Sequence, residues 1–278
     1  MNILEFTLLV WAVSVVAGFL GALTGLGGGV VVIPLLTLAF GVDIHYAIGA
    51  ALVSVIATSS GAAAAYVREG FSNIRVGMFL EIATTAGALV GAALVLYLRV
   101  SVIAIIFGVV LLYSAYSSIV PAPHDKEDPP PDRLATRLRM DSTYPADGRL
   151  QPYHVRGVPL GSALMFVAGI LSGLLGIGSG AVKVLAMDKA MKLPFKVSTT
   201  TSNFMIGVTA AAGAGVYLSR GYIDPGLSMP VMLGVLSGSL VGARLLAGAK
   251  VRILRIIFSS VIALLGIQMI YKGLSGKL

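Results

Sequence analysis

A single lysine and a short run of hydroxyl and amide side chains interrupt the apolar second half of this chain. Lys183 follows Gly180 by three residues in an otherwise aliphatic stretch, and Thr199–Asn203 comes next. An ammonium group near several neutral hydrogen-bonding groups suits a small oxyanion that is bound without covalent chemistry. Two simpler interpretations stay open, because a lysine can also extend to an interface and hydroxyls can also cap a helix.

Two glycine-rich phrases supply a second group of candidate ligands. Gly18–Gly29 reads GFLGALTGLGGG, and Gly169–Gly180 reads GILSGLLGIGSG. Glycine leaves backbone N–H groups accessible, and successive N–H groups before a helix attract anions. Close packing of helices is the alternative explanation. The predicted substrate-binding residues are Gly25, Gly27, Gly28, Gly29, Gly176, Gly178, Ser179, Gly180, Lys183, Thr199, Thr200, Ser202 and Asn203.

Glu81 is the candidate for coupling to protons. It lies six residues after Arg75, within the apolar stretch Val76–Leu98. Either it is a solvated carboxylate near an interface, or it is a buried group that takes up and releases a proton. Thr58 and Thr209 occupy matched positions in the two halves, and a hydroxyl that bonds back to the preceding helical turn explains each of them.

The composition excludes a water-soluble fold. Of the 278 residues, 57% are hydrophobic and 12% are charged, and the mean hydropathy is +0.94, whereas soluble domains carry about 25% charged residues. The chain has no cysteine, and its three histidines lack metal-ligand spacing, so we expect neither a metal nor a cofactor. The net charge of +8 reports membrane orientation rather than nucleic-acid binding. We therefore expect an all-α integral membrane protein.

The glycine phrases belong to a duplication that runs through most of the chain. Matches continue after both phrases with the same offset and no gap, and internal duplication in an apolar chain is typical of secondary transporters. The chain divides into a first repeat (residues 1–120), a polar connector (residues 121–159) and a second repeat (residues 160–278). The matched pairs include Tyr66 and Tyr217, Gly70 and Gly221, Met78 and Met229, Gly87 and Gly238, Gly91 and Gly242, and Phe107 and Phe258.

Each repeat is predicted to hold a glycine-broken helical hairpin followed by three transmembrane helices. A spanning helix needs about 20 apolar residues, whereas about 11 helical residues rise only about 16 Å. The second arm of each hairpin therefore cannot span comfortably, and the hairpin is either re-entrant or has one tilted leg. Non-helical backbone at membrane depth is tolerated only against protein or water, which places the bends inside the protein. The hairpin arms are Ile3–Leu23 with Val30–Phe40, and Leu160–Leu175 with Ala181–Met187. The long stretches are Tyr46–Val67, Val76–Leu98, Val100–Val120, Val197–Leu218, Gly226–Ala247 and Ile253–Tyr271.

The basic residues predict that the two repeats have inverted topology. Arg68 and Arg75 lie in one loop of the first repeat, whereas Lys189, Lys192 and Lys196 lie in a non-equivalent loop of the second. Because Lys and Arg are retained on the cytoplasmic side of a membrane, equivalent loops must face opposite sides. We expect both loops and the connector to be cytoplasmic and both termini to lie outside.

The connector is polar and rich in proline and arginine. It contains Pro129–Pro131 and a turn at Tyr144–Gly148, and it offers little apolar area to bury. We expect a solvent-exposed linker with a short amphipathic helix at Asp132–Met140. A docking or regulatory role is the alternative.

Several of these motifs together resemble a known family. Gly18–Gly29 followed by Pro34, the helix opening Ala47–Ser54, and Gly169–Gly180 with Thr200–Asn203 resemble the TauE/SafE family of membrane proteins. The resemblance covers the chain apart from the connector. It implies a multi-pass transporter of the bacterial inner (plasma) membrane that exports sulfite or sulfur-containing organic anions and is coupled to protons.

The residues and the resemblance together predict a secondary transporter that exports sulfite or an organosulfonate such as sulfoacetate by alternating access. A passive anion channel is the alternative, and flux that persists without a proton gradient would favour it. An enzyme is not expected, since the membrane part lacks clustered histidines, a carboxylate pair and a Ser–His–Asp set. The expected partners are the small anion and the lipid bilayer, without nucleic acid, and a homodimer stays open.

Overall fold

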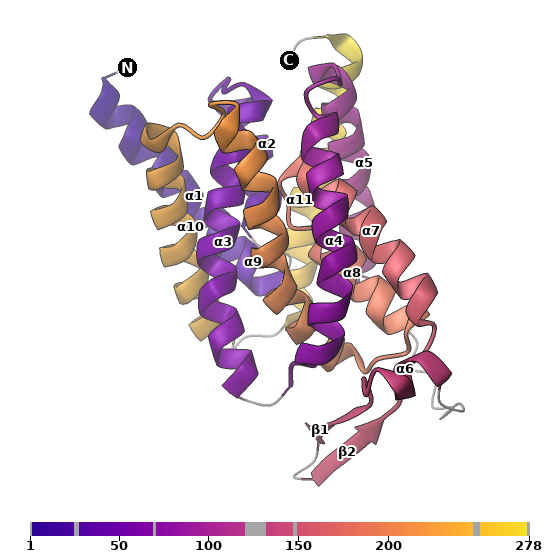
Figure 1. The fold of residues 1–278 in the computed structure, drawn as a ribbon. Coiled ribbons are helices and arrows are strands. Elements are labelled where there is room, and N and C mark those ends of the chain that lie inside the picture. Colours follow the sequence, from indigo (N-terminus) through magenta and orange to yellow (C-terminus); the bar gives the residue numbers. More distant parts are fainter. Residues whose placement is uncertain are drawn as a thin grey trace.

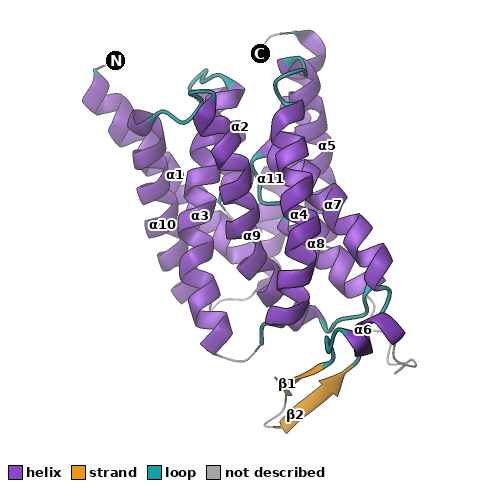
Figure 2. Cartoon of the chain, in the orientation of Figure 1, coloured by secondary structure: helices purple, strands orange, loops and turns teal. Residues whose placement is uncertain are grey.

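The chain folds mainly into helices, which form a bundle with a small β-hairpin at one end (Figure 1) (Figure 2). This computed structural model describes residues 2–24, 28–68, 71–119, 132–146, 149–246 and 251–276. The first repeat contains α1 Ile3–Thr24, α2 Gly29–Ala39, α3 Ile44–Arg68, α4 Ile74–Leu94 and α5 Val100–Ile119. The connector contains α6 Arg133–Arg137, β1 Ser142–Ala146 and β2 Arg149–Tyr153. The second repeat contains α7 Val158–Leu175, α8 Gly180–Leu185, the π-helical turn η1 Ala186–Ala190, α9 Phe195–Ser219, α10 Pro225–Leu246 and α11 Val251–Ser275.

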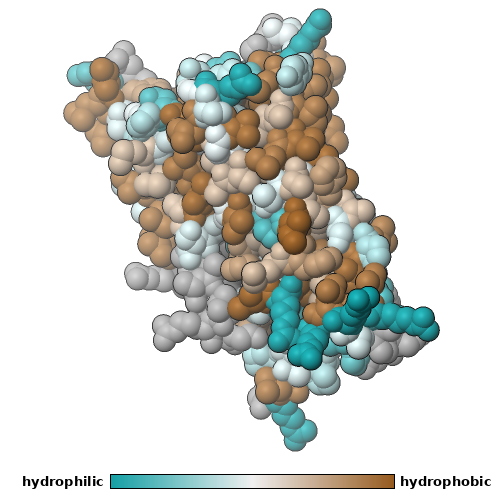
Figure 3. All heavy atoms as spheres, in the orientation of Figure 1, coloured by the Kyte–Doolittle hydropathy of each residue, from teal (hydrophilic) through white to brown (hydrophobic). Residues whose placement is uncertain are grey.

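Several helices have the length and composition of membrane-spanning segments. Within the described residues, Ile3–Leu20, Ile74–Leu94 and Val158–Leu175 are long and apolar enough to cross a membrane, and shorter apolar windows lie in α2, α3, α5, α10 and α11. Hydrophobic side chains cover most of the middle of the face in Figure 3, and hydrophilic ones gather toward its ends. Such a surface matches the apolar core of a bilayer, so the predicted helical membrane protein is confirmed.

Each half begins with a helical hairpin that is broken at its glycine phrase. In the first half, α1 is followed by α2, a helix of 11 residues. In the second half, α7 ends at Leu175, and the chain turns through residues 176–179 into α8, which continues as η1. The predicted second arm, Ala181–Met187, is therefore shorter than the observed arm, which ends at Ala190. Three long helices follow each hairpin, in the predicted order.

Glycines let two pairs of helices cross in backbone contact. A Cβ atom added to Gly87 of α4 would overlap the carbonyl oxygen of Phe166 in α7. The arrangement recurs between α10 and α1, where a Cβ at Gly238 would overlap the carbonyl oxygen of Val15. Small residues at such crossings let helices in lipid approach closely. Because Gly87 and Gly238 are repeat-equivalent, the first helix of each repeat packs against the fourth helix of the other.

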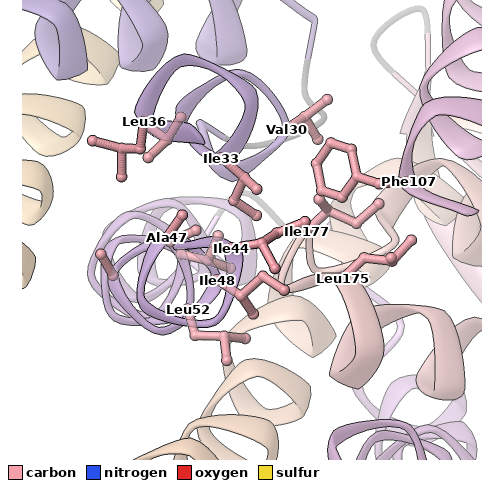
Figure 4. Close-up of a cluster of buried hydrophobic side chains, with 14 of the residues drawn as sticks. Val30, Ile33, Leu36, Ile44, Ala47, Ile48, Leu52, Phe107, Leu175 and Ile177 are labelled. Atoms are coloured by element: carbon pink, nitrogen blue, oxygen red, sulfur yellow. The ribbon is translucent and has the colours of Figure 1, made fainter. Parts of the chain in front are cut away.

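A hydrophobic cluster fills the region where the broken arms meet the long helices (Figure 4). Val30 of α2, Phe107 of α5 and Ile177 of the second bend lie close together, next to buried residues of α3 such as Ile48. The backbone of the second bend is therefore covered by protein and not by lipid. This is the setting in which non-helical backbone is tolerated at membrane depth.

The described part of the connector, residues 132–146 and 149–159, docks against the bundle, which corrects the prediction of a solvent-exposed linker there. Met140 is 1% exposed and Val155 is 0% exposed. Both pack in one cluster with Val76 of α4, Met187 of η1 and Val197 of α9. The prediction was wrong because the polar character of the whole segment concealed a few apolar side chains that the fold directs to the bundle.

The secondary structure of the connector is partly as predicted. The expected helix at Asp132–Met140 is present but ends at Arg137, and the Asp132 carboxylate caps it by accepting a 3.0 Å hydrogen bond from the Leu134 N–H group. The first three residues of the predicted turn at Tyr144–Gly148 lie in β1, which pairs antiparallel with β2, so the prediction of a turn is wrong for them. The two strands were not predicted, and residues 147 and 148 lie outside the described part.

Candidate functional site

Lys183 lies inside the bundle. Its side chain is 0% exposed, and its Nζ donates a hydrogen bond of 2.6 Å to Oγ1 of Thr209. The side chain of Lys183 points toward α9 because α8, the short arm, packs against that helix. The interpretation of a lysine extending to an interface is therefore wrong. A buried ammonium group at this depth is the feature from which the site is built.

Glu81 of α4 compensates this charge. Its Oε1 accepts a hydrogen bond of 2.6 Å from Oγ1 of Thr209 and one of 3.2 Å from Oγ1 of Thr85. Glu81 is 8% exposed, so the interpretation of a solvated carboxylate is also wrong. Its second oxygen, Oε2, is buried and has no hydrogen-bond partner among the described residues. A buried ammonium and a buried carboxylate, joined through one hydroxyl, thus compensate each other.

Thr209 has a second interaction that the sequence did not reveal. Its hydroxyl does bond back to the carbonyl oxygen of Met205, at 3.0 Å, as expected. The same oxygen stands between Lys183 and Glu81, which come from α8 and α4. Sequence spacing alone does not show that three residues on three different helices are in contact. The available signal was that all three are polar residues within apolar stretches.

The repeat-equivalent positions carry no charge. The offset between the glycine phrases relates each member of this group to a residue of the other half, and only the threonine is retained. Thr58 bonds to backbone oxygens of its own helix, at 3.0 and 3.2 Å. The duplicated fold therefore has one charged and one uncharged version of the same position. The pairs are Lys183 and Val32, Thr209 and Thr58, and Glu81 and Met232.

The start of α2 contacts the second glycine bend inside the protein. A Cβ atom at Gly29 would lie 3.2 Å from the carbonyl oxygen of Gly176. Gly176 and Gly178 have φ values of +66° and +69°, which residues with a Cβ atom rarely adopt. The glycines are thus required by the turn and by the close packing of the arms. Gly25 and Gly27 lie outside the described residues, so their role as ligands stays a prediction.

A cavity of about 10 Å³ lies beside the second bend. This volume accommodates about one water molecule, so a sulfur oxyanion would enter only if the arms separated. The Oγ of Ser179 donates a hydrogen bond to the carbonyl oxygen of Ala168 in α7, which ties the bend to the first arm. The lining residues are Val30, Val110, Ser114, Ile177, Ser179, Gly180 and Val182.

The polar run at the start of α9 serves two different places. Oγ of Ser202 donates a 3.4 Å hydrogen bond to the carbonyl oxygen of Gly180, so this residue lies beside the second bend. Oγ1 of Thr200 instead donates to the carbonyl oxygen of Phe71 at 3.1 Å, and Oγ1 of Thr199 bonds within its own helix. The predicted patch is therefore only partly assembled next to Lys183. Thr200 and Ser202 are buried, whereas Thr199 and Asn203 are half-buried.

An open pocket of about 160 Å³ lies where the connector meets the α3–α4 loop. Nη1 of Arg75 donates a 3.0 Å hydrogen bond to the carbonyl oxygen of Arg139 at its edge. Deeper in the bundle, a Cβ atom at Gly77 would lie 3.2 Å from Cγ2 of Thr201, so α4 and α9 are in close contact between the pocket and Glu81. The lining residues are Ser72, Asn73, Ile74, Arg75, Arg139, Asp141 and Ser142.

Comparison with known proteins points to membrane transport. The model of the family described as "Sulfite exporter TauE/SafE" matches residues 10–269. The chain is 26% identical over 278 residues to the probable membrane transporter protein YunE of Bacillus subtilis, covering 98% of this chain and 99% of that one. It is 29% identical over 238 residues to the probable membrane transporter protein YdhB of the same species, covering 85% and 87%. A probable membrane transporter protein of Methanocaldococcus jannaschii is 25% identical over 273 residues, 93% of each chain. No solved structure matches the chain.

Proposed function

Because the chain belongs to the sulfite exporter TauE/SafE family of membrane transporters, we propose that it is a secondary transporter that exports a small sulfur-containing anion, coupled to protons. The anion is sulfite or an organosulfonate such as sulfoacetate, and the membrane is the bacterial plasma membrane. The observation that carries this proposal is the fully buried Lys183, compensated by Glu81. Intramembrane ionisable residues are costly, and their usual role is to mark a substrate or ion pathway.

The anion contacts Lys183 and the neutral donors around it. Ser202 and Thr209 lie on the side of α9 that packs against α8 and α4. Backbone N–H groups of the bends, at Gly25, Gly27–Gly29 and residues 177–180, complete the set of donors, as does Asn203. The predicted donor at Gly176 is corrected, because its N–H group already donates a 2.8 Å hydrogen bond to the carbonyl oxygen of Ser172. A desolvated cation with several oriented donors is the environment that a small oxyanion requires.

Alternating access follows from two inverted repeats that exchange roles. Supporting this, the first helix of each repeat packs on the fourth helix of the other, through repeat-equivalent Gly87 and Gly238. The α3–α4 loop and the start of α9 also meet at the connector end, where the Asn73 N–H group donates a 3.0 Å hydrogen bond to Oγ1 of Thr201. This shared end is the one that holds the basic loops, as inverted topology requires. Both termini lie at the opposite end in Figure 1.

A ligand-stability screen of the purified protein tests the substrate class. The probes are sulfite, sulfate, thiosulfate, sulfoacetate and taurine, and a ligand that binds the folded state raises its melting temperature by mass action. Lys183→Met keeps the apolar length of the side chain and removes its charge. Loss of one partner of a desolvated charged contact costs about 2–5 kcal/mol, which is roughly a 30-fold to several-thousand-fold loss of affinity.

Val32→Met is the matched control, because it changes the repeat-equivalent position without altering charge. If Lys183→Met lowers the stability too far, Lys183→Met/Glu81→Gln keeps the site uncharged and serves instead. If a folded Lys183 variant binds the anion with an affinity within about threefold of wild type, Lys183 is not part of the binding site. Absence of stabilisation of the wild type by every probe would reject the proposed substrate class.

A further inference from the structure

Lys183 and Glu81 are one buried cation and one buried anion, and their charges balance. Lys183 Nζ donates to Thr209 Oγ1, and this hydroxyl donates to Glu81 Oε1, each at 2.6 Å. The lysine is 0% exposed and the glutamate 8% exposed. The two 2.6 Å hydrogen bonds are as short as charge-assisted ones, so the arrangement suits a protonated lysine and an ionised glutamate.

Other charges on the packed elements lie elsewhere. α7 has no titratable side chain, and α9 contributes Lys196, whose ammonium sits 3.8 Å over the ring of Phe71 near the connector. Tyr217 of α9 donates its hydroxyl to the carbonyl oxygens of α7. The remaining charged residues of α4 and η1 are Arg75, Asp188 and Lys189, and Arg75 bonds to the connector. Within the group itself, Lys183 and Glu81 balance each other.

A substrate anion at Lys183 changes this balance. It brings a second negative charge to a site with one cation, so the ionised Glu81 loses its compensation. A proton on Glu81 removes the extra charge of the carboxylate, so the loaded site holds the ammonium, the anion and a neutral carboxyl group. This loaded site is neutral for a singly charged anion such as hydrogensulfite, and it carries one excess negative charge for a doubly charged anion such as thiosulfate. The buried Oε2, which has no partner among the described residues, is where that proton can reside without breaking the bond from Thr209 to Oε1.

From this balance, and resting on the proposed function, we infer that the substrate anion and one proton bind together and cross in the same direction. With a singly charged anion, symport alternates between two compensated sites, the empty ion pair and the site loaded with both anion and proton. A second charge on the anion adds equally to the loaded sites of symport and antiport. Antiport would instead move a loaded site with one excess negative charge and an empty site with one excess positive charge. Uncompensated charges at membrane depth are costly, so the geometry selects symport. Outward flux then needs an anion gradient that exceeds any opposing proton gradient.

Flux measured together with internal pH tests this inference. Wild-type protein is reconstituted in vesicles that contain a pH-sensitive dye, and a gradient of sulfite or thiosulfate is applied. Thiosulfate stays ionised near neutral pH, so it separates the proton carried by the protein from any proton carried by the ligand. Inward anion flux should acidify the lumen by one proton per anion, and the affinity for thiosulfate should fall by up to about tenfold per pH unit as Glu81 ionises.

Glu81→Gln keeps the shape of the protonated side chain, so it should bind thiosulfate with little pH dependence and exchange it without moving protons. Met232→Gln, at the repeat-equivalent position, is the control and should retain coupling. Alkalinisation of the lumen, anion flux without pH change in the wild type, or proton flux in the Glu81 variant would each overturn symport while leaving transport intact. If the wild type moves neither anion, the proposed substrate class fails first, and the inference fails with it.

Discussion

The side-chain amide of Asn73, at the start of α4, donates a hydrogen bond of 2.7 Å to the phenol oxygen of Tyr153, at the end of β2. The same amide donates to the carbonyl oxygen of Met140 at 2.8 Å, while Oδ1 of Asn73 accepts from the Val76 N–H group and caps α4. The backbone N–H group of Asn73 donates a hydrogen bond to Oγ1 of Thr201 in α9. Asn73 therefore joins the connector to both halves of the bundle. The connector is therefore a part of the folded protein.

The Asn73–Tyr153 contact predicts that the connector loosens at high pH. Burial raises the pKa of Tyr153 above its ordinary value of 10.0, so the folded state favours the neutral phenol. The resulting stabilisation is present below pH 10 and is lost as the pH rises through the folded-state pKa. Limited proteolysis of the hairpin between neutral pH and pH 11 measures this release. Tyr153→Phe should abolish the pH dependence, and an unchanged profile in that variant would assign the release to other groups.

Docking of the connector also predicts a large effect at Met140. This side chain is 1% exposed, and truncation of a buried methionine to alanine costs about 2–5 kcal/mol. Met140→Ala should therefore increase cleavage of the connector by protease and lower the melting temperature. Leu150→Ala, at a position 69% exposed in the same segment, is the control and should be close to neutral. Equal sensitivity of the two variants would mean that the connector is undocked in solution.

The glycine crossings predict matched sensitivity in the two repeats. Gly87→Ala and Gly238→Ala each place a methyl group against a backbone carbonyl oxygen of the facing helix, which cannot move aside as a side chain can. Both should lower the yield of folded protein and the melting temperature to a similar extent. Gly215→Ala lies in α9 with no atom within 4 Å of the added group and should stabilise slightly, since alanine favours helix by up to about 1 kcal/mol. If Gly87→Ala lowers the melting temperature and Gly238→Ala does not, the two crossings are not equivalent.

Inverted topology predicts which ends of the bundle face the same side. Because the natural chain has no cysteine, single cysteines are clean probes. Leu150→Cys in the connector and Tyr97→Cys after α4 occupy positions that are 69% and 85% exposed. An impermeant thiol reagent should label Tyr97→Cys from outside the cell and Leu150→Cys only after the membrane is opened. Labelling of both from outside would require a different topology.

The Lys183–Glu81 pair predicts strong coupling in a double-mutant cycle. Lys183→Met leaves the carboxylate of Glu81 buried and uncompensated, and loss of one partner of a buried pair typically costs about 3–5 kcal/mol. Lys183→Met/Glu81→Gln removes both charges and should recover much of the stability lost in the single variant. Thermal unfolding of the wild type, both single variants and the double variant completes the cycle. Additive effects of the two substitutions would show that the charges do not interact.

The sequence alone determined the class of fold and the order of its parts. Its apolar composition requires a membrane, and the repeated glycine phrase marks a duplicated unit with a broken hairpin in each half. These properties are local: composition, periodicity and the conformational freedom of glycine can all be read along the chain. Lys183 and Glu81 were recognisable for the same reason, because a charge within an apolar stretch is costly wherever the stretch folds.

Only the tertiary structure decided how these residues interact. Lys183 and Glu81 were predicted with separate roles, and packing of α4, α8 and α9 joins them through Thr209. The connector was predicted to be solvent-exposed from its composition, yet Met140 and Val155 meet an apolar surface formed by helices of both repeats. A side chain's partner depends on which distant helices pack together. That packing arises from long-range contacts such as the backbone crossing at Gly87, which no local pattern specifies.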